Sequence, residues 1–279
     1  MNLAGLDLSI IGPAFLAGLL VLATHVPMGR QVLSRGIIFI DLAVAQVAGL
    51  GVIVADRLGW SPHGWAVQGA AVSAAFVGAL VLRWTERRWP QVQEALIGVL
   101  FVLAASTALL LLAGNPHGGE QLRDLLVGQI LWVTPVMLAP AALVYALVLA
   151  GWFAAGARLG RAGFYLLFAL TVTVSVQLVG VYLVFASLIL PALAGCRHAG
   201  PQGLIVGYAT GIAGYASGLA ASAWLDLPSG PAVVVALALW TAAAAAVPLR
   251  RSTQQHAQPK HQQEGGEQPL QQQGRDAVG

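Results

Sequence analysis

Charged residues are scarce in this chain. Of its 279 residues, only 9% are Asp, Glu, Lys or Arg, whereas 58% are hydrophobic, and the mean hydropathy is +0.77. A soluble domain would be about a quarter charged, because its surface faces water. The composition therefore excludes an ordinary soluble protein. Long unbroken apolar runs favour membrane-spanning helices over a membrane barrel, whose strands alternate over segments of about ten residues.

Cysteine and the common catalytic motifs are also lacking. The single Cys196 excludes an internal disulfide framework and a cysteine-based metal cage. The sequence has no GxxxxGK[ST] loop, no HExxH phrase and no GxSxG elbow. We therefore expect that the chain is not an enzyme and does not bind ATP itself. Energy for any transport would come from a partner protein or an ion gradient.

Seven apolar runs of about 17–25 residues predict membrane spans. They cover residues 9–28, 36–55, 64–82, 95–114, 133–153, 203–224 and 231–249. Arginines follow alternate runs, namely Arg30, Arg35, Arg83, Arg87, Arg88, Arg158, Arg161, Arg250 and Arg251. The positive-inside rule places these groups in the cytoplasm. Because orientation explains the net charge of +3, we expect a membrane-lipid environment and no nucleic-acid partner.

Residues 163–195 form a further apolar stretch that is too long for one ordinary crossing. Two crossings, with a bend near Gln177 to Gly180, keep the final arginines in the cytoplasm. The halves are short, but a broken helix is tolerated when it is buried among its neighbours. The predicted fold is therefore an all-α, polytopic transmembrane helix bundle of eight or nine membrane-embedded helices.

The chain divides into two parts by composition. Residues 1–251 form the predicted transmembrane domain. Residues 252–279 contain nine Gln and almost no apolar side chains. Such a segment cannot bury enough surface to offset the entropy of ordering, so we predict a disordered cytoplasmic tail.

Two polar residues stand within the second apolar run. Asp41 lies five residues inside the run 36–55, and Gln46 follows in the same run. An ionisable group in the bilayer costs roughly 2.5–3.5 kcal/mol on insertion scales, so Asp41 is a candidate contact for a metal cation. The alternative is a carboxylate satisfied by a neighbouring helix. Five residues turn a helix by about 140°, so Gln46 would share no face with Asp41. Gln46 is either a second metal contact or an interhelical hydrogen-bond donor.

Two further residues could contact a metal ion. Glu94 opens the fourth apolar run, where an acid also favours the positive end of the helix dipole. His25 lies near the end of the first run and could ligate a metal. A lone intramembrane histidine more often makes one hydrogen bond. Small residues in the second and seventh runs, including Gly49, Gly51, Gly211 and Gly214, indicate closely packed helices.

Five phrases in this sequence resemble the membrane-spanning permeases of ABC importers for zinc, manganese and iron. The stretch RGIIFID at residues 35–41, continuing to Gly49, resembles the family motif R-x-x-S-L-x-G-D-A-L-S-H-A. The other phrases are EALIGVLF at 94–101, LLVGQIL at 125–131, VGVYLVFASLILP at 179–191 and LDLPSGP at 225–231. They occur in the order typical of the family and span most of the chain.

The resemblance implies a multi-pass permease, similar to type II ABC importers, in the inner membrane of a bacterium. Its implied partners are a cytoplasmic ABC ATPase subunit, an extracytoplasmic metal-binding protein and a second permease copy. The transported substrate would be a divalent metal ion, with no permanently bound cofactor. Asp41 matches the family's aspartate. The family's histidine, four residues later, is Ala45 here.

The cytoplasmic segment that docks the ATPase is shortened in this chain. In the family this segment lies between the fifth and sixth spans and carries an acidic phrase. Here it is reduced to AAGARLGRAG at residues 154–163. The resemblance implies that Arg158 and Arg161 contact the ATPase. Both residues also fit the role of positive-inside anchors.

Alternative functions remain open on the sequence alone. The loss of the histidine is compatible with an ABC permease for a chelated metal or another small solute. A secondary carrier coupled to protons through Asp41 and Glu94 is a candidate from a different class. A membrane scaffold or enzyme is disfavoured, because no nucleophile–base arrangement is visible.

Overall fold

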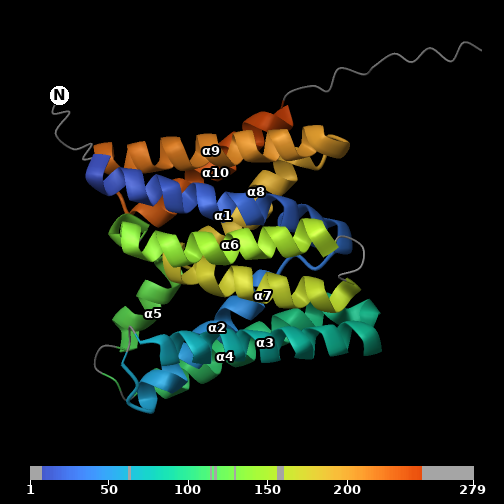
Figure 1. Cartoon of the computed structure of the whole chain (residues 1–279), viewed down its shortest axis with the longest axis vertical. Helices are drawn as coiled ribbons and strands as arrows, with labels where there is room; N and C mark the ends of the chain where they lie inside the picture. Colours follow the sequence, from blue (N-terminus) through green and yellow to red (C-terminus); the bar gives the residue numbers. More distant parts are fainter. Residues whose placement is uncertain are drawn as a thin grey trace, which may run out of the picture. The chain divides into compact units, whose positions relative to one another are not determined.

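The computed structural model describes residues 8–61, 64–113, 115, 118–128, 130–155 and 160–246. Within these ranges the chain is helical and contains no strand (Figure 1). The α-helices are α1 (Leu8–Arg35), α2 (Ile40–Arg57), α3 (Trp65–Arg88), α4 (Gln93–Leu112), α5 (Gly118–Val127), α6 (Pro135–Ala155), α7 (Gly160–Val179), α8 (Val181–Gly195), α9 (Gly200–Leu225) and α10 (Ser229–Ala246). The predicted tail, 252–279, lies outside the described residues.

The helices confirm the predicted polytopic all-α bundle. Seven of those described are long and apolar enough to cross a membrane, namely α1, α3, α4, α6, α7, α9 and α10. Helix α2 has 18 residues but carries three charged ones, Asp41, Asp56 and Arg57. Helix α8 has 15 residues. Together these nine agree with the prediction of eight or nine membrane-embedded helices.

The break predicted within residues 163–195 falls at Gly180. Helix α7 ends at Val179 and α8 begins at Val181, while Gly180 between them has φ of +82°. Only glycine adopts this conformation readily, because it has no Cβ. The backbone there lies against Gly128, which also has a positive φ, of +70°. The chain therefore reverses at a point where two glycines allow close backbone contact.

Two elements differ from the sequence prediction. The apolar run 36–55 is not one helix, because Gly36 with φ of +67° ends α1 and α2 begins only at Ile40. No helix was predicted between the apolar runs 95–114 and 133–153, yet Gly118–Val127 form the short helix α5. This segment mixes polar and apolar residues over only ten positions, so it lacks the long apolar run that predicts a span.

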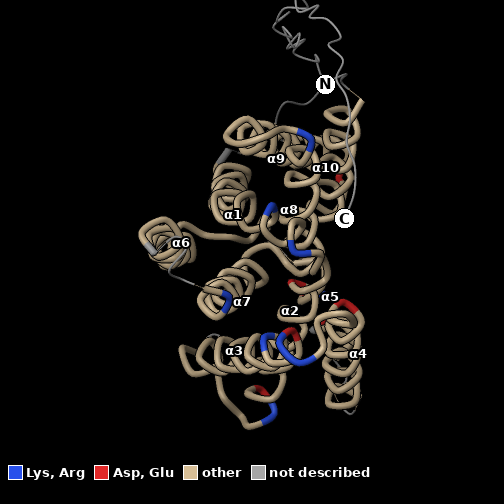
Figure 2. Tube along the Cα trace, turned by 90° about the vertical axis from the view of Figure 1, so that its right-hand side faces the viewer, with Lys and Arg blue, Asp and Glu red and all other residues tan. Residues whose placement is uncertain are grey.

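Helix α8 lies at the centre of one half of the bundle, packed against α1, α9 and α10. The other half is formed by α2 with α3 and α4, and α7 contacts α3, α2 and α6. Figure 2 shows α8 and α7 between the α9–α10 pair and the α3–α4 pair. The two halves meet where α2, α7 and α8 contact one another, and these three helices carry most of the features described below.

Small residues allow the helices to approach closely, as predicted. A Cβ on Gly211 would lie 2.6 Å from Leu22 of α1, and one on Gly214 would lie 2.4 Å from Leu237 of α10. In α2, a Cβ on Gly51 would lie 2.7 Å from Ala74 of α3. A side chain at any of these positions would overlap with a neighbouring helix, so close helix packing requires glycine there.

Several arginines lie at or near helix ends that meet at one end of the bundle, which we call the arginine-rich end. It comprises Arg30, Arg35, Arg83, Arg87, Arg88, Arg161 and Arg197. Contacts link these helix ends directly, since Arg30 Nη1 donates to the Gly200 carbonyl at 2.9 Å and Arg197 donates to that of Ala245. The clustering agrees with the orientation predicted from the positive-inside rule.

Candidate functional site

A cavity of about 520 Å³ opens between α2, α4, α5, α8 and α10. Its volume falls in the range of small-molecule sites, roughly 300–1,000 Å³. The lining is almost wholly apolar and includes Leu42 of α2, Phe101 of α4, Leu122 of α5 and Phe185 of α8. Because it lies among the helices that separate the two halves of the bundle, this cavity is the best candidate for a substrate pathway.

Gln46 is the main polar side chain of the cavity. It is 7% exposed and lines both this cavity and a smaller adjoining one. No hydrogen-bond partner for its amide is found among the described residues. An amide that is enclosed without a partner is unfavourable unless a ligand or water satisfies it. Within the described residues, Gln46 thus faces the cavity and makes no interhelical hydrogen bond.

Asp41 lies in the first turn of α2 and is 1% exposed. No described side chain donates a hydrogen bond to either carboxylate oxygen, and the polar groups that interact with it are the backbone N–H groups of Asp41 and Leu42. The positive end of the helix dipole stabilises an acid at this position. Because α2 begins at Ile40, Asp41 is its second residue, although it lies five residues inside the apolar run 36–55. Its neighbour Leu42 lines the cavity, whereas Asp41 itself does not.

Glu94 belongs to the first turn of α4 and reaches the start of α2. Its Oε1 accepts a hydrogen bond from the backbone N–H of Phe39 at 3.2 Å. Phe39 is the N-cap residue of α2, and its ring stacks on Phe185 of α8 at 6.1 Å between centroids. The structure thus brings Glu94 and Asp41 to the same helix start. Gln46 faces the cavity more than one turn away, as the helical spacing predicted.

No group of three or more His, Cys, Asp or Glu that could hold a metal ion occurs among the described residues. His25 is fully buried in α1, and its Nδ1 lies 2.9 Å from the Val21 carbonyl oxygen and 3.1 Å from Thr24 Oγ1. Its environment therefore matches the hydrogen-bonding interpretation of a lone intramembrane histidine. Gln177 is exposed.

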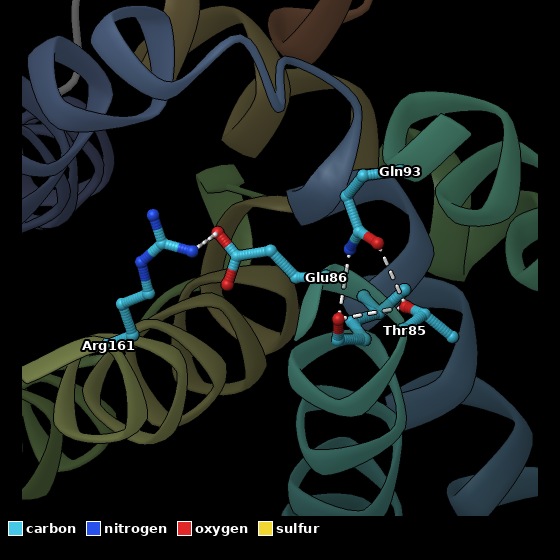
Figure 3. Close-up of polar contacts among 5 residues, drawn as sticks. Thr85, Glu86, Gln93 and Arg161 are labelled. Carbon is cyan, nitrogen blue, oxygen red and sulfur yellow. Dashed lines mark hydrogen bonds and ion pairs between the residues drawn. The ribbon is translucent and has the colours of Figure 1, made fainter. Parts of the chain in front are cut away.

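A second polar cluster, at the arginine-rich end, was missed by the sequence reasoning. Glu86 lies in the last turn of α3 and is 8% exposed. Its Oε1 forms an ion pair with Arg161 Nη1 of α7 at 3.3 Å (Figure 3). The sequence signal was an acid at the negative end of a helix dipole, flanked by Arg87 and Arg88, where a cation is expected instead.

Gln93 closes the connection between α3 and α4 beside this ion pair. Its Nε2 donates to the Leu82 carbonyl at 2.9 Å, and its Oε1 accepts from Thr85 Oγ1 at 3.0 Å (Figure 3). Gln93 is 4% exposed, so both ends of a buried amide are satisfied. This contrasts with Gln46, whose amide faces the cavity.

Of the two arginines predicted to contact an ATPase, the structure describes Arg161. Its side chain is 62% exposed despite the ion pair with Glu86. Arg158 lies outside the described residues.

Comparison with known proteins gives a family and a fold. The model of the ABC 3 transport family matches residues 7–159 and 156–247. The fold is similar to PsaBC from Streptococcus pneumoniae in complex with Fab, with TM-score 0.67, 18% identity, and coverage of 85% of this chain and 89% of that chain. It is also similar to an inward-facing conformation of a proposed metal-chelate type ABC transporter, with TM-score 0.64, 16% identity, and coverage of 87% and 89%.

Proposed function

Since this chain belongs to the ABC 3 transport family, we propose that it is the membrane-spanning permease subunit of an ABC importer for a divalent metal cation, zinc, manganese or iron. ATP hydrolysis would take place on a separate cytoplasmic ATPase subunit. The cation would arrive from an extracytoplasmic metal-binding protein, and a second permease copy would complete the pathway. The site of action would be the inner membrane of a bacterium.

The observation that carries this proposal is the state of Asp41. A carboxylate that is 1% exposed, with no described side chain donating a hydrogen bond to either oxygen, is costly unless a cation compensates it. Carboxylate oxygens bind divalent metal ions. Asp41 directly precedes Leu42, which lines the cavity, so a cation leaving the cavity toward the arginine-rich end would pass close to it.

The proposed mechanism is alternating access. ATP-driven movement of the ATPase subunits would rock two permease copies about a central path. Asp41 would replace part of the hydration shell of the passing cation, and Glu94 and the Gln46 amide would offer further oxygen ligands on the way. Glu94 also holds the start of α2 through Phe39, which fixes where the Asp41 carboxylate stands.

Uptake by the reconstituted complex tests this proposal. Vesicles that contain permease, ATPase and binding protein are loaded with ATP on the ATPase side, and accumulation of zinc and manganese is measured. Asp41→Asn should lower the uptake rate at least about tenfold, because an amide is a weaker metal ligand, while the bundle remains folded. Asp226→Asn is the matched control, since Asp226 is exposed and Asn tolerates its left-handed backbone. An unchanged rate in Asp41→Asn removes Asp41 from the mechanism.

A second candidate cargo is a metal chelate or another small solute. The cavity is lined almost entirely by apolar side chains, and the histidine typical of the family is Ala45 here. Such a lining suits a ligand with apolar surface better than a hydrated ion. Competition decides between the two: a chelate permease takes up the radiolabelled chelate and is not inhibited by excess free ion.

A further inference from the structure

Glu86 occupies a position where a carboxylate needs compensation. It lies in the last turn of α3, at the negative end of the helix dipole, and its side chain is 10% exposed. Both effects disfavour the charged form unless a cation is close. The next two residues in sequence, Arg87 and Arg88, are exposed. The compensating charge therefore comes from another helix.

Arg161 supplies this charge from the start of α7. The 3.3 Å ion pair joins it to Glu86 Oε1, whereas Oε2 is buried without a hydrogen bond to any described residue. Arg161 is the second residue of α7, and only residues 156–159 separate α7 from the end of α6.

A second arginine lies near the same cluster. The guanidinium of Arg35, in the last turn of α1, stands 4.0 Å from the centre of the Phe164 ring. Phe164 follows Arg161 by three residues on α7. Arg35 interacts electrostatically with both Glu86 and Arg161, and its Nη1 is buried without a hydrogen-bond partner in the described ranges. Loss of Arg161 would therefore not leave the buried carboxylate without any cation, which makes the Glu86–Arg161 pair breakable.

We propose that Glu86 is a positioning residue of the transport cycle. Its ion pair with Arg161 holds the start of α7 against α3 in one state, and Arg35 compensates the carboxylate when α7 moves away from α3 in the other. This inference rests on the proposed function, because the ATPase is what would drive the movement of α7. Helix α7 also packs on α2, which carries Asp41, so a shift of α7 can reach the cation path.

Cargo transported per ATP hydrolysed is the quantity that tests this role. In the reconstituted complex, Glu86→Gln and Arg161→Gln should each lower this ratio at least about fivefold while ATP hydrolysis and assembly persist. The double variant should be no worse than the poorer single variant, since the two residues act as one unit. Arg161→Lys should retain most of the ratio. Arg88→Gln, at the exposed end of α3, is the matched control and should be unchanged.

A second measurement needs no ATPase. Hydrogen exchange of residues 160–165 in the purified full-length permease should accelerate at least about fivefold in Glu86→Gln, and not in Arg88→Gln, because the first turn of α7 loses its attachment. Wild-type ratios in both single variants, or losses that simply add in the double variant, overturn the inference. If wild-type vesicles show no ATP-driven uptake while exchange changes as expected, the proposed function fails and the attachment of α7 by Glu86 stands.

Discussion

The carboxylate of Glu94 on α4 accepts a hydrogen bond from the backbone N–H of Phe39, the N-cap residue of α2, with 3.2 Å between Oε1 and N. No side chain of α2 itself caps this end. The free backbone N–H at the start of the helix that carries Asp41 is therefore satisfied by an acid from a different helix. This explains why Glu94 and Asp41, 53 positions apart in the sequence, belong to one structural unit.

We predict that Glu94→Ala lowers the free energy of unfolding by roughly 1–2 kcal/mol, because the Phe39 N–H loses its acceptor and the dipole of α2 loses a nearby charge. Denaturant titration in detergent measures this change. Uptake should fall as well, since the turn that positions Asp41 is loosened.

Glu94→Gln distinguishes the effect of the hydrogen bond to Phe39 from the effect of the negative charge. Its amide oxygen can still accept from Phe39, so at least about half of the stability lost in Glu94→Ala should be retained. If uptake in Glu94→Gln is nonetheless as low as in Glu94→Ala, the charge acts on the cation. Equal stability of all three proteins would contradict the capping role.

The two buried glutamines should respond in opposite ways to replacement by leucine. Gln46→Leu removes an amide that has no partner among the described residues, so stability should stay the same or rise, while uptake falls if the amide meets the cargo. Gln93→Leu breaks bonds to Thr85 and Leu82 and should cost about 1–3 kcal/mol. Thermal unfolding and vesicle uptake of both variants provide the comparison. A destabilised Gln46→Leu would show that its amide is structurally satisfied.

Tyr215→Phe should change stability only slightly. The hydroxyl of Tyr215 on α9 lies 2.7 Å from Ser187 Oγ on α8, but Ser187 also donates to the Leu183 carbonyl at 2.6 Å. The serine keeps a partner after the substitution, so the loss should be near the membrane average of about 0.6 kcal/mol. Denaturant titration measures it, with Tyr145→Phe as a parallel case, because Tyr145 pairs with Ser175 at 2.7 Å. A loss several times larger would mean that the hydroxyls fix helix packing.

The long helices were predictable because membrane insertion imposes long apolar runs. The arginine positions indicated whether an even or an odd number of crossings separates two loops. The break near Gly180 followed from the same argument, because residues 163–195 must cross twice to keep the final arginines in the cytoplasm. Helix α5 was not predictable in this way, since it is short and amphipathic. The start of α2 was also misplaced, because Gly36 allows a positive φ and ends α1 inside a stretch that is apolar throughout.

The polar clusters depended on contacts between distant parts of the chain. The sequence singled out Asp41, Gln46 and Glu94 one by one, because each is polar in an apolar run. It could not show that Glu94 caps α2, since that requires the packing of α4 on α2. Glu86 was overlooked because the charged residues beside it suggested an exposed helix end. Its burial follows only from the position of α7, whose Arg161 comes from a segment read as a cytoplasmic loop.

Gly180 should tolerate no side chain. An alanine Cβ there would lie 2.4 Å from the backbone N of Gly128 and 2.7 Å from the carbonyl carbon of Val127, and φ of +82° is strained for any other residue. We therefore expect Gly180→Ala to lower the free energy of unfolding by at least about 2 kcal/mol, since the reversal between α7 and α8 must open. Gly98→Ala is the control, because nothing lies within 4 Å of its Cβ position in α4 and alanine favours a helix. Denaturant titration of both variants in the same detergent should therefore show changes of opposite sign, and a stable Gly180→Ala would mean that α7 and α8 can be joined without the close contact to Gly128.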